Sequence, residues 1–175
     1  MINITAAAKA AEHVLLMGFD VDGTLTDGGL YFGAQGEALK RFSVFDGQGL
    51  RLLMQAGVEV TWITARHSEI VAKRAADLGI RQVIQHCNNK LDAFDQMRQH
   101  RGLDWNQCGF FGDDWPDFQL LKKVHLACTT NTAPLALQQQ AVWVNTRPAG
   151  NGAARELCDF ILAHKPHFTN PMESQ

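Results

Sequence analysis

The chain has 175 residues, a hydrophobic fraction of 46% and a formal net charge of −2 at pH 7. This length suits one domain with a substantial core, and the near-zero charge excludes a broad basic surface for nucleic acid or an acidic membrane. No apolar stretch is long enough to span a bilayer, and the N-terminus lacks a basic segment followed by an apolar one. We therefore expect a cytoplasmic protein with one domain over residues 1–165, a mobile tail over 166–175, and no nucleic-acid or membrane partner.

Apolar runs typical of strands alternate along the chain with segments typical of helices. The predicted strands cover residues 14–18, 58–63, 83–84, 108–111, 124–128 and 142–144. The predicted helices begin near Asp46, Ser68, Asn88 or Asn89, Asp114 and Gly152. This alternation predicts an α/β fold with a doubly wound, mainly parallel, Rossmann-like sheet.

Residues 28–45 interrupt the alternation directly after the first strand. The apolar segments 30–32 and 39–44 flank a turn at 33–36, which predicts a small β-hairpin. A two-stranded ribbon alone is only marginally stable, and this one carries an unusual amount of apolar surface. Its apolar residues are Leu30, Tyr31, Phe32, Leu39, Phe42, Val44 and Phe45. We therefore expect the hairpin to pack against other subunits of an oligomer.

Polar residues follow several of the predicted strands and begin one of the predicted helices. They are Asp20 and Asp22 after the first strand, Thr64 after the strand at 58–63, Asp113 and Asp114 after the strand at 108–111, and Lys90 at a helix start. In doubly wound sheets, ligands bind outside the C-terminal ends of the strands. The fold therefore brings these residues toward one crevice.

The residue types in this set suit phosphoryl transfer. Asp20 and Asp22 project the same way if the strand continues, and two close carboxylates need a cation or a shared proton, so the pair is a metal site, an acid/base site or both. One carboxylate can attack phosphorus while another protonates the leaving oxygen. Aspartate oxygens suit Mg²⁺, and threonine and lysine side chains stabilise phosphoryl oxygens. Each residue alone is more typical of a loop or a helix cap, and only the ordered set favours catalysis.

The order DxDxT, a threonine closing a strand, a lysine and GDDxxD resembles the haloacid dehalogenase superfamily of phosphotransferases, over residues 18–117 at least. Further segments resemble its capless branch and, within that branch, the family of 3-deoxy-D-manno-octulosonate 8-phosphate phosphatases. These segments are residues 20–28, 36–42, 46–49, 88–90 and 150–156. The resemblance implies a Mg²⁺-dependent phosphatase for lipopolysaccharide precursors that forms an aspartyl-phosphate. It also implies a hairpin in place of a cap domain and a homotetramer whose subunits complete one another's sites.

The resemblance implies a role for each matching residue. Asp20 would be the nucleophile and Asp22 the general acid/base. Mg²⁺ would bind Asp20, the backbone carbonyl of Asp22, and Asp113. Thr64 and Lys90 would bind the transferred phosphoryl group. The remaining implied residues are Asp114 and Asp117, which would orient the metal shell and the lysine, and Lys40, Asp46, Gly47 and Arg66, which would contribute to substrate binding.

The chain departs from the family pattern in the parts that read the substrate. Thr64-Ala65-Arg66 stands in place of Thr-Gly-Arg, His67-Ser68-Glu69 replaces a stretch that is often basic, and Asn151 occupies a place often held by arginine. A related nonulosonate 9-phosphate is therefore an alternative substrate. A phospho-accepting signalling module of the receiver type is the alternative from another class, although a general acid two residues from the acceptor favours turnover.

Overall fold

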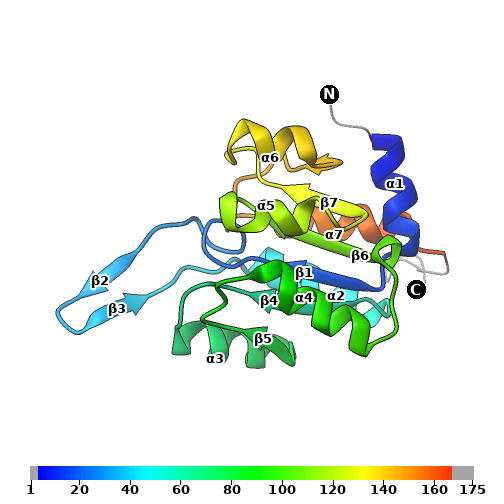
Figure 1. Cartoon of the computed structure of the whole chain (residues 1–175). Coiled ribbons are helices and arrows are strands. Elements are labelled where there is room, and N and C mark those ends of the chain that lie inside the picture. Colours follow the sequence, from blue (N-terminus) through cyan, green and yellow to red (C-terminus); the bar gives the residue numbers. More distant parts are fainter. Residues whose placement is uncertain (1–3, 167–175) are drawn as a thin grey trace, which may run out of the picture.

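The computed structural model describes residues 4–166, so the predicted tail lies outside the described residues except for Pro166. Its centre is a six-stranded sheet in which every pairing is parallel (Figure 1). The strands, in spatial order, are β5 (Gln82–Ile84), β4 (Glu59–Ile63), β1 (Leu16–Phe19), β6 (Cys108–Gly112), β7 (Leu126–Thr129) and β8 (Trp143–Val144). The predicted doubly wound α/β fold is confirmed.

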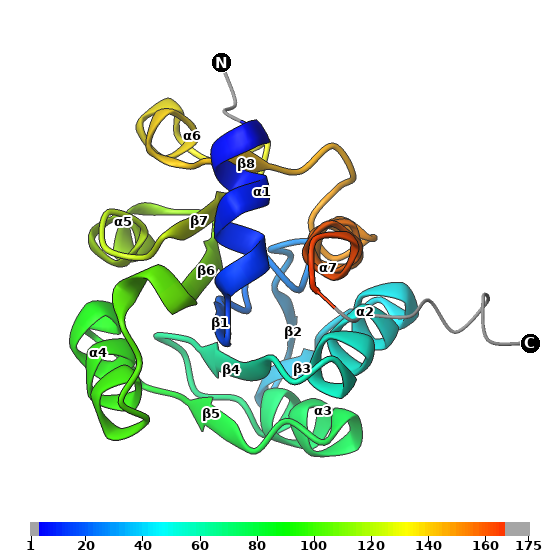
Figure 2. The same cartoon turned by 90° about the vertical axis from the view of Figure 1, so that its right-hand side faces the viewer.

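Helices cover both faces of the sheet (Figure 2). The larger apolar core lies between one face and the helices α1 (Ile4–His13), α2 (Val44–Gln55), α3 (Glu69–Leu78) and α7 (Ala153–Ala163). A second core lies under α4 (Lys90–His100), α5 (Trp115–Leu121) and α6 (Leu135–Gln140), beside the short 3₁₀ helix η1 (Trp105–Gln107). Among the described residues, no helix is both long enough and apolar enough to cross a membrane.

The helix after the hairpin begins earlier than the sequence predicts. It starts at Val44, with Ser43 as its N-cap, and the Ser43 hydroxyl accepts a hydrogen bond from the Asp46 N–H (3.4 Å). Asp46 thus lies in the first turn of α2 and is not the residue before the helix. Serine and aspartate are both common at N-caps. An N-cap side chain accepts a hydrogen bond from an amide two or three residues later, as Ser43 does from Asp46.

The inserted hairpin consists of β2 (Tyr31–Gly33) and β3 (Gly36–Leu39), which pair antiparallel and project from the body (Figure 1). The turn ends at Gly36, whose φ of 108° suits glycine. Apolar side chains of the hairpin face solvent in this single chain, with Phe32 64% exposed and Leu39 51% exposed. Such exposure is the property that led to the expectation of an oligomer.

The strand order creates one topological switch point. After β1, the chain first adds β4 and β5 on one side and then β6, β7 and β8 on the other. At such a point the chain leaves adjacent strands in opposite directions. This leaves a crevice at the C-terminal ends of β1, β4 and β6. Asp20, Thr64 and Asp113 are the first residues after these three strands.

Candidate active site

The loop after β1 is shaped so that Asp20 lies at the strand end and the chain turns sharply behind it. The Asp20 N–H still donates to a carbonyl of β6 (2.9 Å), so the parallel ladder extends through this residue. The carbonyl of Val21 then accepts from the amides of residues 24–26 (3.0–3.4 Å). Gly23 has a φ of 94°, and a Cβ there would overlap the carboxylate of Asp113. Glycine is therefore required for both the turn and the close approach.

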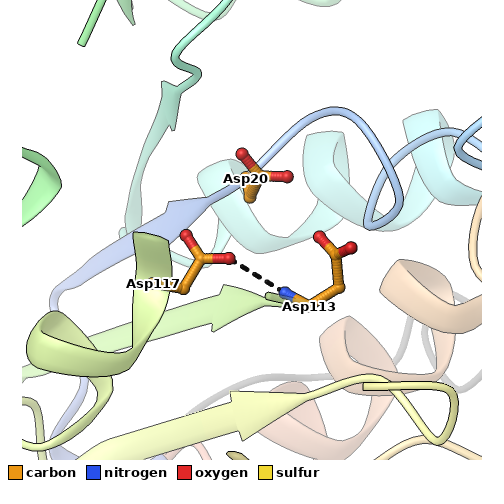
Figure 3. Close-up of side chains that lie close together, drawn as sticks. All are labelled: Asp20, Asp113 and Asp117. Atoms are coloured by element: carbon orange, nitrogen blue, oxygen red, sulfur yellow. Dashed lines mark hydrogen bonds between the residues drawn. The ribbon is translucent and has the colours of Figure 1, made fainter. Parts of the chain in front are cut away.

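Three carboxylates converge beside this turn (Figure 3). One oxygen each of Asp20, Asp113 and Asp117 lie within 4.8 Å of one another. The Thr24 hydroxyl donates to Asp113 (2.8 Å), and one oxygen of Asp117 accepts from the amides of Asp113 (3.0 Å) and Asp114 (3.2 Å). Asp114 itself is exposed and is the N-cap residue of α5. The cluster thus joins the ends of β1 and β6 to the first turn of α5.

Lys90 provides the positive charge in this cluster. It is the first residue of α4, behind the N-cap Asn89, and only 4% of it is exposed. Its Nζ lies 2.5 Å from a carboxylate oxygen of Asp20 and 2.5 Å from one of Asp117. Burial disfavours the ammonium, but attraction to these two carboxylates outweighs burial and raises the pKa of Lys90. A lysine in the first turn of a helix is unfavourable to the helix dipole, so its position suits the site more than the helix.

The negative charges of the cluster are not balanced. Three carboxylates meet one ammonium, which leaves a formal charge of −2. Burial, reinforced by repulsion from Asp117, raises the pKa of Asp20 well above its usual range, and burial likewise raises the pKa of Asp113. A hard divalent cation with oxygen ligands fits both the donor atoms and the missing charge. The residues present are therefore suited to Mg²⁺.

A second group of side chains lies around Asp22. One of its oxygens accepts from Lys40 of the hairpin, and the other accepts from the Thr64 hydroxyl (3.4 Å). Glu37 of β3 contacts both Lys40 (2.8 Å) and Arg66 (3.4 Å). The structure thus joins the hairpin to the loop after β4, beside Asp22. Sequence reasoning missed Glu37, whose signal is its place three residues before Lys40 in the segment 36–42.

Asp46 and Gly47 lie elsewhere, at the packing of helices. The Asp46 carboxylate reaches the N-terminus of α7 and accepts from the amides of Gly152 (3.2 Å) and Arg155 (2.8 Å). Burial raises the pKa of Asp46 above its ordinary value, although these hydrogen bonds oppose the shift. A Cβ on Gly47 would lie 2.5 Å from the Arg74 guanidinium of α3. Both residues therefore hold helices together, and their contacts lie apart from the aspartate cluster.

Known proteins resemble this chain over nearly all of its length. The 3-deoxy-D-manno-octulosonate 8-phosphate phosphatase KdsC of Escherichia coli K12 is 38% identical over 161 residues, which are 92% of this chain and 85% of that protein. The phosphatase of the same name from Moraxella catarrhalis, solved with magnesium, phosphate and KDO, has a TM-score of 0.89 and 33% identity, and the match covers 93% of each chain. A Legionella pneumophila protein assigned to the HAD superfamily (subfamily III A) has a TM-score of 0.89 and 36% identity, covering 93% of this chain and 90% of that one.

No family model matches the chain. The pairwise identity and the coverage of both chains nevertheless show the family of this chain. The strands, the short hairpin and the ordered site residues all lie within the matched length. The chain belongs to the family of 3-deoxy-D-manno-octulosonate 8-phosphate phosphatases, within the haloacid dehalogenase superfamily.

Proposed function

We propose that this protein is a Mg²⁺-dependent phosphatase that hydrolyses 3-deoxy-D-manno-octulosonate 8-phosphate through an aspartyl-phosphate. One observation carries the proposal: Asp20, at the end of the central strand, is buried, bound to Lys90 and grouped with a second acidic strand-end residue, Asp113. A carboxylate held in this way is oriented for attack on a phosphoryl group that a cation and a lysine neutralise. The relatives' names support the substrate.

Asp20 and Asp22 divide the chemistry between them. A carboxylate oxygen of Asp20 attacks phosphorus, and the bond from phosphorus to the sugar oxygen breaks as the aspartyl-phosphate forms. Asp22 gives a proton to the departing sugar oxygen and then takes a proton from the water that hydrolyses the acyl-phosphate. We propose that Thr64 and Lys90 bind the transferred phosphoryl oxygens; the Thr64 hydroxyl, 3.4 Å from Asp22, and the Lys90 ammonium, beside Asp20, support this role.

Mg²⁺ would be held by Asp20, Asp113 and the backbone carbonyl of Asp22. When bound, it neutralises phosphoryl charge and orients the phosphate. We assign Asp117 to positioning, because its oxygens already accept from Lys90, from the Asp113 amide and from the Asp114 amide. Asp114 is the N-cap residue of α5, and its amide donates to the Asp117 carboxylate, so we assign it to the support of Asp117.

Lys40 and Arg66 are the residues we propose to bind the sugar-acid end of the substrate. Both are cations beside Asp22, on the hairpin base and on the loop after β4. Guanidinium and ammonium groups are suited to a carboxylate. Asp46 and Gly47 would influence this pocket only through the packing of α2 against its neighbours.

Hydrolysis by the purified protein tests the proposed function. Phosphate release is measured with Mg²⁺ on 3-deoxy-D-manno-octulosonate 8-phosphate, on nonulosonate 9-phosphates and on p-nitrophenyl phosphate. We expect the octulosonate to have the highest kcat/KM and Asp20→Asn to abolish release from every substrate. Full activity of that variant contradicts the nucleophile assignment. A phosphoenzyme that persists for minutes instead of turning over indicates a receiver-like switch.

We also propose a homotetramer that forms through the hairpin and acts in the cytoplasm. The exposed apolar side chains of the hairpin support self-association, and the four buried cysteines, all free thiols, are compatible with a reducing compartment. Light scattering after size exclusion should give four chains for the wild type and fewer for Phe32→Asp. An unchanged mass for this variant would show that Phe32 is not part of the interface.

A further inference from the structure

Glu37 touches both cations of the proposed substrate pocket. One of its oxygens lies 2.8 Å from Lys40 Nζ and 3.4 Å from an Arg66 Nη, and the other accepts from the Ser68 hydroxyl (2.7 Å). We propose that Glu37 is a positioning residue that holds Lys40 and Arg66 as a pair for the carboxylate of the sugar acid. This inference rests on the proposed function and names a specificity determinant within it.

The charges around Glu37 explain why a carboxylate belongs there. Lys40 and Arg66 come from separate segments and repel each other, so each needs an anion to remain beside the other. The Glu37 side chain is 13% exposed and that of Lys40 only 1%. Burial opposes ionisation, but hydrogen bonds from Lys40 and Ser68 and the attraction of both cations outweigh it and lower the pKa of Glu37. Glu37 is therefore held as an anion where the two cations meet.

The Ser68 side of this contact is rigid, which makes Glu37 an anchor for the hairpin. The Ser68 N–H donates to the Gln85 side chain (2.6 Å), and the Arg66 carbonyl accepts from the His86 N–H (3.3 Å). The loop after β4 is thus fixed to the loop after β5. Glu37 fastens β3 to this loop within one chain, while Phe32, its cross-strand partner in β2, stays exposed. Ser68 lies in the stretch that departs from the family pattern.

One donor of the Arg66 guanidinium has no partner in this arrangement. The Nε of Arg66 is buried and has no hydrogen-bond acceptor among residues 4–166. A carboxylate oxygen of Asp22 lies 4.0 Å from this Nε, which is beyond hydrogen-bond distance. The guanidinium is therefore held by Glu37, while the Arg66 side chain as a whole is 40% exposed. A carboxylate of the substrate can pair with this guanidinium.

Glu37→Gln tests this role because glutamine keeps the shape but removes the charge. With 3-deoxy-D-manno-octulosonate 8-phosphate we expect KM to rise about tenfold, the size of one charge-assisted hydrogen bond, while kcat changes by about threefold or less. With p-nitrophenyl phosphate, which has no carboxylate, kcat/KM should fall by about threefold or less. Ser68→Ala, which frees Glu37 on one side only, should raise KM about two- to threefold. Glu12→Gln, at an exposed position of α1, is the matched control.

A double-mutant cycle separates positioning from general structural damage. If Glu37 acts through Arg66, then Glu37→Gln should cost less than about twofold once Arg66→Met is present. The inference is overturned if Glu37→Gln lowers kcat/KM equally for both substrates or for neither of them. It is also overturned if the effects of Glu37→Gln and Arg66→Met on kcat/KM are fully multiplicative. If the wild type prefers the octulosonate phosphate and Glu37→Gln keeps that preference, only the role of Glu37 is refuted. A wild type with no such preference refutes the proposed function and this inference together.

Discussion

Replacing Asp20 by asparagine should stabilise the metal-free protein while it abolishes catalysis. At an effective dielectric constant of about 20, each repulsion of Asp20 by Asp113 and Asp117 at 4.8 Å costs about 3.5 kcal/mol or more, and the attraction to Lys90 at 2.5 Å contributes about 6.6 kcal/mol. The repulsions and the attraction nearly cancel, so the penalty of burying the Asp20 charge remains. Asparagine avoids that penalty and still accepts a hydrogen bond from Lys90.

The size and the pH dependence of this effect follow from the raised pKa. Single stabilising substitutions commonly contribute about 0.5–2 kcal/mol, which corresponds to about 1–8 °C in Tm for a chain of this length. Because burial raises the pKa of folded Asp20, the folded state binds its proton more tightly than the unfolded state does. The wild type therefore loses stability as the pH rises from about 4 through the folded pKa, and asparagine does not. The advantage of the variant should widen with pH.

Thermal unfolding in a chelator, at several pH values between about 5 and 8, measures the effect. Added Mg²⁺ should raise the Tm of the wild type more than that of Asp20→Asn, because the variant has lost one ligand and one charge. Asp159→Asn is the control, since its carboxylate pairs with Arg155 at the surface and should change Tm by less than about 1 °C. A Tm of Asp20→Asn at or below that of the wild type at pH 8 without metal refutes the reasoning.

Other substitutions test the remaining contacts. Lys90→Met should destabilise the metal-free protein by about 3–5 kcal/mol in urea titrations, because two buried carboxylates lose their cation. Gly47→Ala should hardly change the free energy of unfolding, because its Cβ meets a flexible guanidinium and alanine favours the helix. Gly49→Ala should cost about 1–2 kcal/mol, because its Cβ meets the backbone of α7 at 3.1 Å. Asp46→Ala should cost about 1–2 kcal/mol through the lost cap of α7 and should leave kcat/KM for p-nitrophenyl phosphate within about threefold.

The sequence predicted the fold and the cluster well because strand ends impose their own geometry. Asp20, Thr64 and Asp113 each follow a buried strand, and parallel strands place such residues at one edge of the sheet. Lys90 was predicted from a helix start, and the structure places its ammonium against Asp20. These predictions depend on local pattern and on topology, both of which can be seen in the chain.

Contacts between distant segments could not be predicted in the same way. Glu37 meets Ser68 only because β3 folds against the loop after β4, and no local pattern predicts that approach. The first helix, α1, was missed although its signal was present: residues 4–13 are rich in alanine, the strongest helix former, and three of those alanines are buried. Its position was not predictable, because α1 packs on α7 from the other end of the chain.

The segment Asp46-Gly47-Gln48-Gly49 shows how a motif can affect a site without touching it. Its carboxylate fixes the N-terminus of α7, and the turn before α7 in turn donates from the Gly150 N–H to the Thr24 carbonyl (3.3 Å). Thr24 then donates from its hydroxyl to Asp113 (2.8 Å). A chain of hydrogen bonds therefore runs from α2 through the C-terminal segment to the acidic cluster. The resemblance placed Asp46 at the substrate, and the structure supports a role in holding the loop that carries Asp20 and Asp22.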